Sequence, residues 1–158
     1  RRQRQMCIRD RSRRDPGVRR TRPAGLTMVL DTSALLAILL GEPEASAMVR
    51  ALARDETRLV GAPTLVEASA VLQARKGPAG DVALDALLER AAIEVIPFSR
   101  PAAQLARLAY GRFGKGIGDP AVLNYGDCLT YGVAMAERQP LLFKGDDFTR
   151  TDVERVEY

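Results

Sequence analysis

The chain of 158 residues contains no histidine. This absence excludes Ser-His-Asp and Cys-His nucleophile pairs, histidine zinc sites and the histidine acid–base pairs of metal-free ribonucleases. Any hydrolytic chemistry must therefore depend on carboxylates, most directly through cations that prefer oxygen ligands.

Cysteine and long apolar runs are also scarce. Beyond residue 27 the only cysteine is Cys128, which excludes a disulfide framework and favours a reducing cytoplasm. The longest unbroken apolar run, Ala34 to Leu40, is too short to cross a bilayer. We therefore expect a cytoplasmic protein with no membrane segment.

Positive charge is concentrated in the first 27 residues, which hold ten arginines and two acids. Without them the chain has 14 basic and 18 acidic residues, so the net charge of +4 becomes −4 for residues 28–158. Residues 1–27 also lack apolar periodicity, so we expect a disordered basic tail. It could touch RNA as a basic arm. The segment Met6 to Arg11, however, back-translates to DNA resembling a transposon end used in library preparation, and we expect read-through ahead of a true start at Met28.

Short apolar runs alternate with helical periodicity in residues 28–158, a length that suits one domain. This order predicts an α/β fold with a mostly parallel central sheet of four to five strands, flanked by helices. The expected strands are 28–30, 58–62, 94–96 and 139–143, with 153–156 as a fifth. The expected helices are 34–40, 44–54, 64–75, 81–92, 100–113 and a helix from about Asp127 to Glu137.

Asp31 follows the first expected strand directly. Ligands of open α/β sheets bind beyond the carboxyl ends of the strands, so this carboxylate stands where chemistry is usually done. Thr32 or Ser33 could then cap the next helix. The alternative is that Asp31 only caps that helix.

Three more acidic positions have similar surroundings. Glu67 interrupts a largely apolar helical stripe, and Asp127 begins a helix whose dipole favours a charged carboxylate. Asp146 and Asp147 follow the fourth expected strand. Each acid has an ordinary alternative: Glu67 as a surface residue, Asp127 as a cap, and the Asp146–Asp147 pair as turn residues.

Together these acids form a pattern, because strand ends and helix starts share one edge of a doubly wound sheet. Carboxylates brought together there would repel one another unless a cation neutralised them. Carboxylate-only ligation suits Mg²⁺, with Mn²⁺ as a substitute, and such a site can hydrolyse phosphodiesters.

The segments Val29–Leu35, Leu123–Cys128 and Pro140–Phe148, with Glu67 in its helix, resemble a VapC-type toxin of the PIN-domain superfamily. The resemblance covers residues 28–158. It implies a single PIN-like domain that acts as a metal-dependent endoribonuclease on RNA, the toxin of a type II toxin-antitoxin system. It also implies a small cognate antitoxin and a homodimer. By position, Asp31, Glu67 and Asp127 match the core acids, and we favour Asp146 over Asp147 as the fourth.

One departure is Asp119, where related chains often carry a histidine, and this puts substrate contacts in its loop in doubt. For the RNA itself, the candidate basic contacts are Arg112, Lys115 and Lys144. The apolar surface of helix 44–54 is a candidate wall for an antitoxin groove, with an intramolecular core stripe as the alternative.

Two other functions compete with the ribonuclease. A phosphatase or receiver domain would use Asp31 as a nucleophile, but it needs a second acid close behind, and Thr32 and Ser33 supply none. A catalytically weak PIN-like module would act mainly as the antitoxin's partner in a repressor complex. The full set of acids favours the nuclease.

Overall fold

A computed structural model of the chain describes residues 27–117 and 122–158. The expected tail, up to residue 26, and Asp119 lie outside these described residues. The described elements are, in order, β1 (Thr27–Leu30), α1 (Thr32–Leu39), α2 (Ala45–Arg54), β2 (Thr57–Gly61), α3 (Ala62–Lys76), α4 (Pro78–Arg90), β3 (Ile93–Ile96), α5 (Arg100–Phe113), α6 (Tyr125–Glu137) and β4 (Leu141–Leu142).

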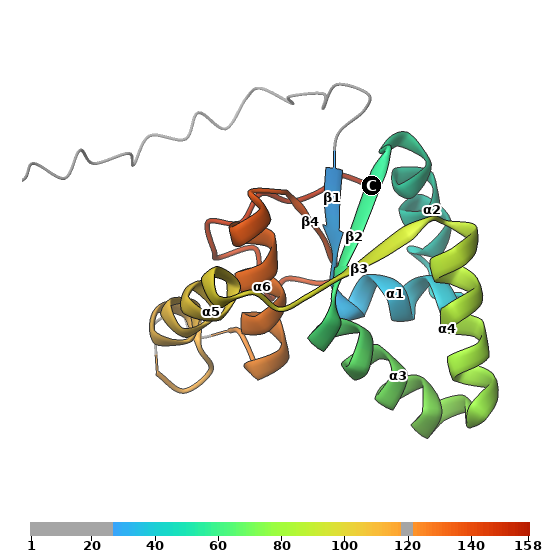
Figure 1. Ribbon diagram of the computed structural model, residues 1–158, viewed down its shortest axis with the longest axis horizontal. Helices are drawn as coiled ribbons and strands as arrows, with labels where there is room; N and C mark the ends of the chain where they lie inside the picture. Colours follow the sequence, from blue (N-terminus) through green and yellow to red (C-terminus); the bar gives the residue numbers. More distant parts are fainter. Residues whose placement is uncertain (1–26, 118–121) are drawn as a thin grey trace, which may run out of the picture.

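The four strands of the described chain form one parallel sheet in the order β3-β2-β1-β4 (Figure 1). Strand order runs outward from β1 through β2 to β3, then returns so that β4 lies on the other side of β1. The point where this order reverses, beyond the ends of β1 and β4, is the usual ligand site of an open α/β sheet. Asp31 and the loop after β4 are both at this point.

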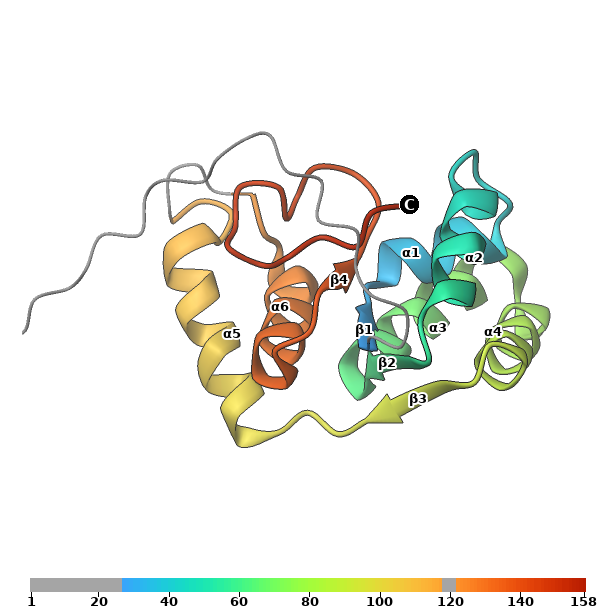
Figure 2. The ribbon, with the colours of Figure 1, turned by 90° about the horizontal axis from the view of Figure 1, so that it is seen from above.

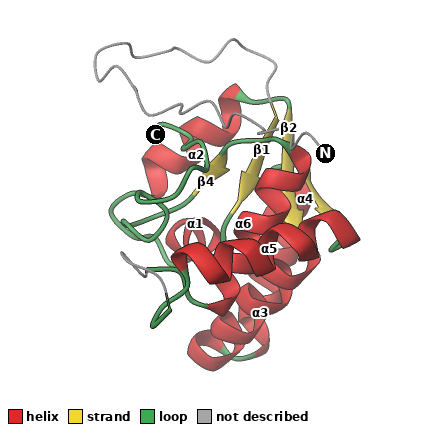
Figure 3. Ribbon diagram, turned by 90° about the vertical axis from the view of Figure 1, so that its left-hand side faces the viewer, coloured by secondary structure: helices red, strands yellow, loops and turns green. Residues whose placement is uncertain are grey.

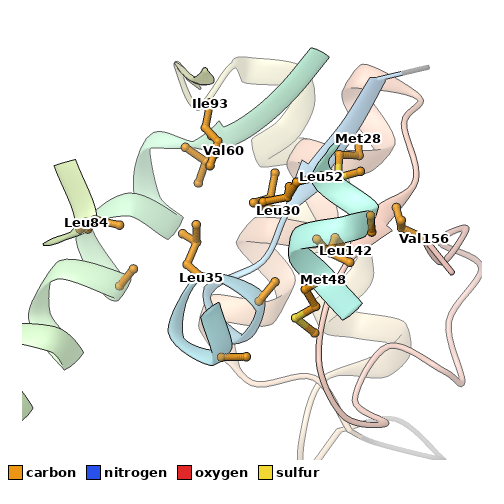
Figure 4. Packing of buried hydrophobic residues seen from close by; sticks show 14 of the residues in the cluster. Met28, Leu30, Leu35, Met48, Leu52, Val60, Leu84, Ile93, Leu142 and Val156 are labelled. Carbon is orange, nitrogen blue, oxygen red and sulfur yellow. The ribbon is translucent and has the colours of Figure 1, made fainter. Parts of the chain in front are cut away.

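Helices cover both faces of the sheet (Figure 2), with α1 to α4 on one side and α5 and α6 on the other. The α5 helix packs against α6, and in Figure 3 it lies in front of α6. Side chains alternate between the faces along each strand. In β1, Met28 and Leu30 join the core under α1 to α4, whereas Val29 joins the core under α5 and α6. The first core is drawn in Figure 4, where Leu30, Val60 and Leu142 from three strands meet Leu35 of α1.

Local sequence explains several element boundaries. Gly61 ends β2 and starts α3 without a loop, and a Cβ there would lie 2.9 Å from Cγ2 of Val133. Gly77 has a φ of 61°, a left-handed conformation that glycine adopts without strain, and Pro78 follows in the first turn of α4. Asn124 and Asp127 form a capping box at the start of α6.

The expected α/β fold is confirmed, with three local differences. Asp31, rather than Thr32 or Ser33, is the N-cap of α1. The α4 helix begins at Pro78 instead of residue 81, because Gly77 turns the chain within one residue. The expected strand 153–156 makes only one bridge, Leu141 with Arg155, since β4 is two residues long and offers little edge to pair with.

The helix 44–54, expected as a groove wall or a core stripe, contributes mainly to the core. Met48, Ala51 and Leu52 are buried in the first core, and Val49 is 48% exposed. None of the helices among the described residues has the length and apolar character needed to cross a membrane.

Candidate active site

Asp31 lies at the end of β1 and is 5% exposed. Its Oδ2 atom accepts hydrogen bonds from the backbone N–H of Ser33 at 2.9 Å and from the Ser33 hydroxyl at 2.6 Å. Burial raises the pKa of Asp31, the two bonds from Ser33 lower it, and the charge of Glu67 raises it again. Asp31 therefore caps α1 and also lies at the point where the strand order of the sheet reverses.

The first turn of α1 connects Asp31 to two other parts of the site. The Ser33 hydroxyl also accepts a hydrogen bond of 2.9 Å from the backbone N–H of Lys144, just after β4. Thr32 donates from Oγ1 to Oε2 of Glu67 at 2.7 Å. Because both side chains follow Asp31 directly, α1 sets the positions of α3 and the loop after β4 relative to this acid.

Glu67 lies on the second turn of α3, and its carboxylate reaches the first turn of α6. A Cβ placed on Gly126 would lie 2.6 Å from Oε1 and 2.7 Å from Oε2 of Glu67. Such distances are shorter than van der Waals contact. The Glu67 carboxylate can therefore keep its position only if residue 126 is glycine. Gly126 is a site residue that was not expected from the sequence, although its position directly before Asp127 is a signal for it.

Asp127 occupies the third position of α6 in the capping box. Its backbone N–H donates to Oδ1 of Asn124 at 2.9 Å, and its Oδ2 accepts from the Asn124 N–H at 2.8 Å. Burial raises the pKa of Asp127 to about 6, and the negative charges of Asp31, Asp147 and Glu67 contribute in the same direction. Asp127 therefore shares its electrostatic environment with three other carboxylates.

Of the two acids in the loop after β4, Asp147 is one whose negative charge raises the pKa of Asp127. The choice of Asp146 favoured from the sequence stays a prediction. The backbone carbonyl of Asp146 accepts hydrogen bonds from Thr149, at 3.0 Å from its N–H and 2.6 Å from its hydroxyl. We refer below to Asp31, Glu67, Asp127 and Asp147 as the acid cluster.

Two of the three basic residues expected to contact RNA have acidic partners. The Lys144 ammonium lies 2.7 Å from Glu42 and 3.2 Å from Glu44, and these hydrogen bonds raise the pKa of Lys144. Arg112 pairs with Asp152 at 3.4 Å. Lys115 is exposed. Of the three, Lys115 is the one that the structure leaves available.

The donor set of the acid cluster fits a divalent cation that prefers oxygen, since it offers carboxylates that repel one another. Hydrogen bonds from Ser33, Thr32 and Asn124 orient three of these carboxylates separately. In these orientations, no three His, Cys, Asp or Glu side chains within residues 27–117 and 122–158 lie close enough together to hold a metal ion. The chemistry of the site thus favours a cation, although the side chains are not gathered around one.

Comparison with known proteins identifies the family of the chain. Residues 28–154 match the family model of the PIN domain. The chain is 46% identical over 129 residues to Ribonuclease VapC28 of Mycobacterium tuberculosis, covering 82% of this chain and 97% of that protein. It is 45% identical over 129 residues to Ribonuclease VapC of Mycolicibacterium smegmatis, covering 82% of this chain and 99% of that protein.

Solved structures share the fold at lower identity. The sarcin-ricin loop cleaving toxin VapC20 of Mycobacterium tuberculosis superposes with a TM-score of 0.68 at 18% identity, covering 83% of this chain and 99% of that one. VapBC2 of Rickettsia felis, bound to a DNA fragment from its promoter, gives 0.65 at 18% identity, covering 84% and 98%. The family match and the identity to full-length relatives show that this chain belongs to the PIN-domain family, among the VapC ribonucleases.

Proposed function

We propose that this protein is the toxin of a type II toxin-antitoxin system and acts as an endoribonuclease that hydrolyses RNA phosphodiester bonds with Mg²⁺, for which Mn²⁺ can substitute. One observation carries the proposal. Asp127 has a pKa raised to about 6 by burial and by the charges of three neighbouring carboxylates, at the edge of the sheet where ligands bind. Relatives that match nearly their whole length are ribonucleases.

A divalent cation in such a site supplies positive charge to the phosphate and activates a water molecule for attack. We assign Asp31 and Asp127 as the main ligands, because each is fixed at a strand end or helix start by hydrogen bonds. Glu67 completes the ligand set or orients the attacking water, and Thr32 fixes one of its oxygens. With no histidine in the chain, proton transfer falls to carboxylates and solvent.

The fourth acid is the least determined member of the set. We assign it to Asp147, because its charge acts on Asp127, and keep Asp146 as the alternative. Both follow β4 in one loop, which the Lys144 N–H fixes to Ser33. A ligand from this loop would complete the site from the β4 side of β1, opposite β2.

The partners proposed for this chain are suggested by its structural neighbours. Structural neighbours include VapBC from Rickettsia felis and Salmonella typhimurium, each bound to DNA. We therefore propose that a small cognate antitoxin binds this chain, that the toxin is a homodimer, and that it acts on RNA in the cytoplasm.

The test is cleavage of total RNA by the full chain, purified free of antitoxin, with Mg²⁺, with Mn²⁺ and with chelator. We expect internal cuts that require the metal and disappear with Asp127→Ala. A folded protein that cuts no RNA under any of these conditions would refute the ribonuclease proposal and leave the alternative, a module that mainly binds antitoxin. If such a protein cuts no RNA but still binds the metal ion, the missing step is one that follows metal binding.

A further inference from the structure

A pocket of about 250 Å³ opens between the N-terminal halves of α3 and α6. Its walls are mostly apolar and come from Pro63, Val66, Ala70, Tyr125 and Leu129. Glu67 and Gly126, the two residues in contact within the site described above, also line it. The pocket therefore shares Glu67 with the acid cluster.

Two apolar side chains of this pocket are strongly exposed. Tyr125 is 73% exposed, and Val66, on the opposite helix, is 68% exposed. The Tyr125 side chain makes no hydrogen bond or ring contact with any other residue that the structure describes. An unoccupied aromatic ring beside a phosphodiester site offers a stacking surface for a flat ligand.

The charges around the pocket exclude a phosphate as its occupant. Among the residues that the structure describes, no lysine or arginine lines it, and its carboxylate, Glu67, belongs to the acid cluster. Thr64 adds a hydroxyl, but this group is buried and already hydrogen-bonded to Thr130 at 2.8 Å. The pocket thus suits the uncharged, planar part of a ligand whose other part lies at the acid cluster.

We propose that this pocket binds one unpaired nucleobase of the RNA substrate, next to the phosphodiester that is cut, with Tyr125 stacked on the base and Val66 against its edge. This inference rests on the proposed ribonuclease function and adds a determinant of which RNA is cut. Proteins that recognise RNA sequence mostly stack unpaired bases on aromatic side chains. Residues 28–158 carry a net charge of −4, so stacking would supply affinity that the net charge of this part of the chain does not.

A binding experiment tests the pocket without cleavage. The probes are single-stranded RNA octamers with 2-aminopurine at one central position and mixed bases elsewhere, titrated with the full chain in chelator and again with Ca²⁺. Stacking should quench the probe with wild type and with Tyr125→Phe. We expect Tyr125→Ala to weaken binding about ten- to hundredfold, the range that loss of one base stack gives. Leu108→Ala is the matched control, because Leu108 is 64% exposed on α5 and does not line the pocket.

A cleavage experiment connects the pocket to specificity. Sequencing the ends of RNA fragments should show a base preference beside the cut for wild type and Tyr125→Phe, and a relaxed preference for Tyr125→Ala. An RNA with an abasic nucleotide at that position should be cleaved more slowly by wild type. The cleavage rate of Tyr125→Ala should change little with the same RNA. Unchanged cut sites and rates in Tyr125→Ala would overturn the proposal. Loss of antitoxin binding or of self-association, with RNA cleavage unchanged, would overturn it in favour of a protein partner.

The two proposals fail in different ways. Quenching that depends on Tyr125, in a wild-type protein that cuts no RNA, would support the base site and refute the hydrolysis. Cleavage that is indifferent to Tyr125 would refute the base site and support the hydrolysis.

Discussion

Thr32 and Glu67 are 35 positions apart in the chain and are joined by a hydrogen bond of 2.7 Å from Oγ1 to Oε2. Thr32 follows the buried Asp31, and Glu67 lies on a helix across the sheet edge from it. The hydroxyl therefore fixes the distance and orientation between two proposed metal ligands. It makes Thr32 a positioning residue rather than a ligand.

We expect Thr32→Val to weaken Mn²⁺ binding and RNA cleavage about tenfold, because loss of a group that orients a ligand typically costs ten- to a hundredfold. Thr32→Ser keeps the hydroxyl and should restore most of both. Calorimetric titration with Mn²⁺ provides a readout independent of cleavage. If Thr32→Val and wild type bind Mn²⁺ equally well, the positioning role is wrong.

Gly126 leads to a steric prediction. Alanine at this position would bring Cβ within 2.6 Å of Oε1 of Glu67, so the carboxylate or the first turn of α6 must move. We expect Gly126→Ala to reduce Mn²⁺ affinity and cleavage by at least tenfold. Gly111→Ala is the control, because a Cβ on Gly111, within α5, meets no atom within 4 Å.

The control also makes a prediction of its own. Alanine is favoured over glycine inside a helix by about 1 kcal/mol, so Gly111→Ala should raise the melting temperature without changing cleavage. If both glycine variants lose activity equally, a general helix effect would explain the loss, and the specific contact with Glu67 would not.

The loop after β4 allows its two acids to be separated. We expect Asp147→Asn to slow cleavage about tenfold and Asp146→Asn to slow it less, because the charge of Asp147 acts on Asp127. For comparison, Asp31→Ala or Asp127→Ala should cost about a hundredfold or more. Single-turnover rates at saturating Mg²⁺ measure all four. A larger loss for Asp146→Asn than for Asp147→Asn would restore the assignment favoured from the sequence.

The sequence was sufficient for features that depend on neighbouring residues. Asp31 after an apolar strand and Asp127 at a helix start could be located because strand ends and helix caps have local signals. Strand and helix order then placed both acids at one edge of a parallel sheet. The confirmed fold follows from this alternation.

Features that depend on residues far apart in the chain could not be predicted from the sequence. The choice between Asp146 and Asp147 depends on how one loop turns, and neighbouring residues do not decide it. Lys144, expected to contact RNA, is held by Glu42 and Glu44, which are about a hundred positions away. Residues 153–156 alternate like a strand, but β4 offers them only one bridge.

Arg58 illustrates a stabilising role that sequence alone did not reveal. Its guanidinium donates to three backbone carbonyls, those of Leu52 at 2.8 Å, Ala91 at 2.7 Å and Asp55 at 2.5 Å. These carbonyls belong to the C-terminal ends of α2 and α4, where the helix dipoles favour positive charge.

We expect Arg58→Ala to lower the free energy of unfolding by about 2 kcal/mol or more, because three hydrogen bonds from a charged donor to the ends of two helices are lost. Arg58→Lys should recover part of this, as an ammonium cannot reach three carbonyls in a fork. Urea unfolding measures the change, with Arg50→Ala on the exposed face of α2 as the control. Equal midpoints for Arg58→Ala and Arg50→Ala would contradict the assignment.

The acid cluster makes the stability of the metal-free protein depend on pH. The pKa of Asp127 is raised from 3.8 to about 6 in the folded chain, so between these values the folded state binds more protons than the unfolded state. Stability contributed by this group is therefore present below about pH 4 and is lost as the pH rises through about 6. Asp152, whose pKa is lowered, acts in the opposite direction at more acidic pH.

Comparison with Asp127→Asn isolates the contribution of Asp127 together with its coupling to the neighbouring carboxylates, because more distant groups titrate equally in both proteins. Asparagine still accepts the Asn124 N–H through its side-chain oxygen, so the capping box survives. In chelator, the melting temperature of wild type should fall relative to that of Asp127→Asn as the pH rises from about 4 to 7. Millimolar Mg²⁺ or Mn²⁺ at pH 7 should raise the wild-type value, because a ligand that binds only the folded state stabilises it, and should raise that of Asp127→Asn less. Parallel pH profiles for the two proteins, together with no effect of metal on either, would show that these carboxylates do not form a coupled cation site.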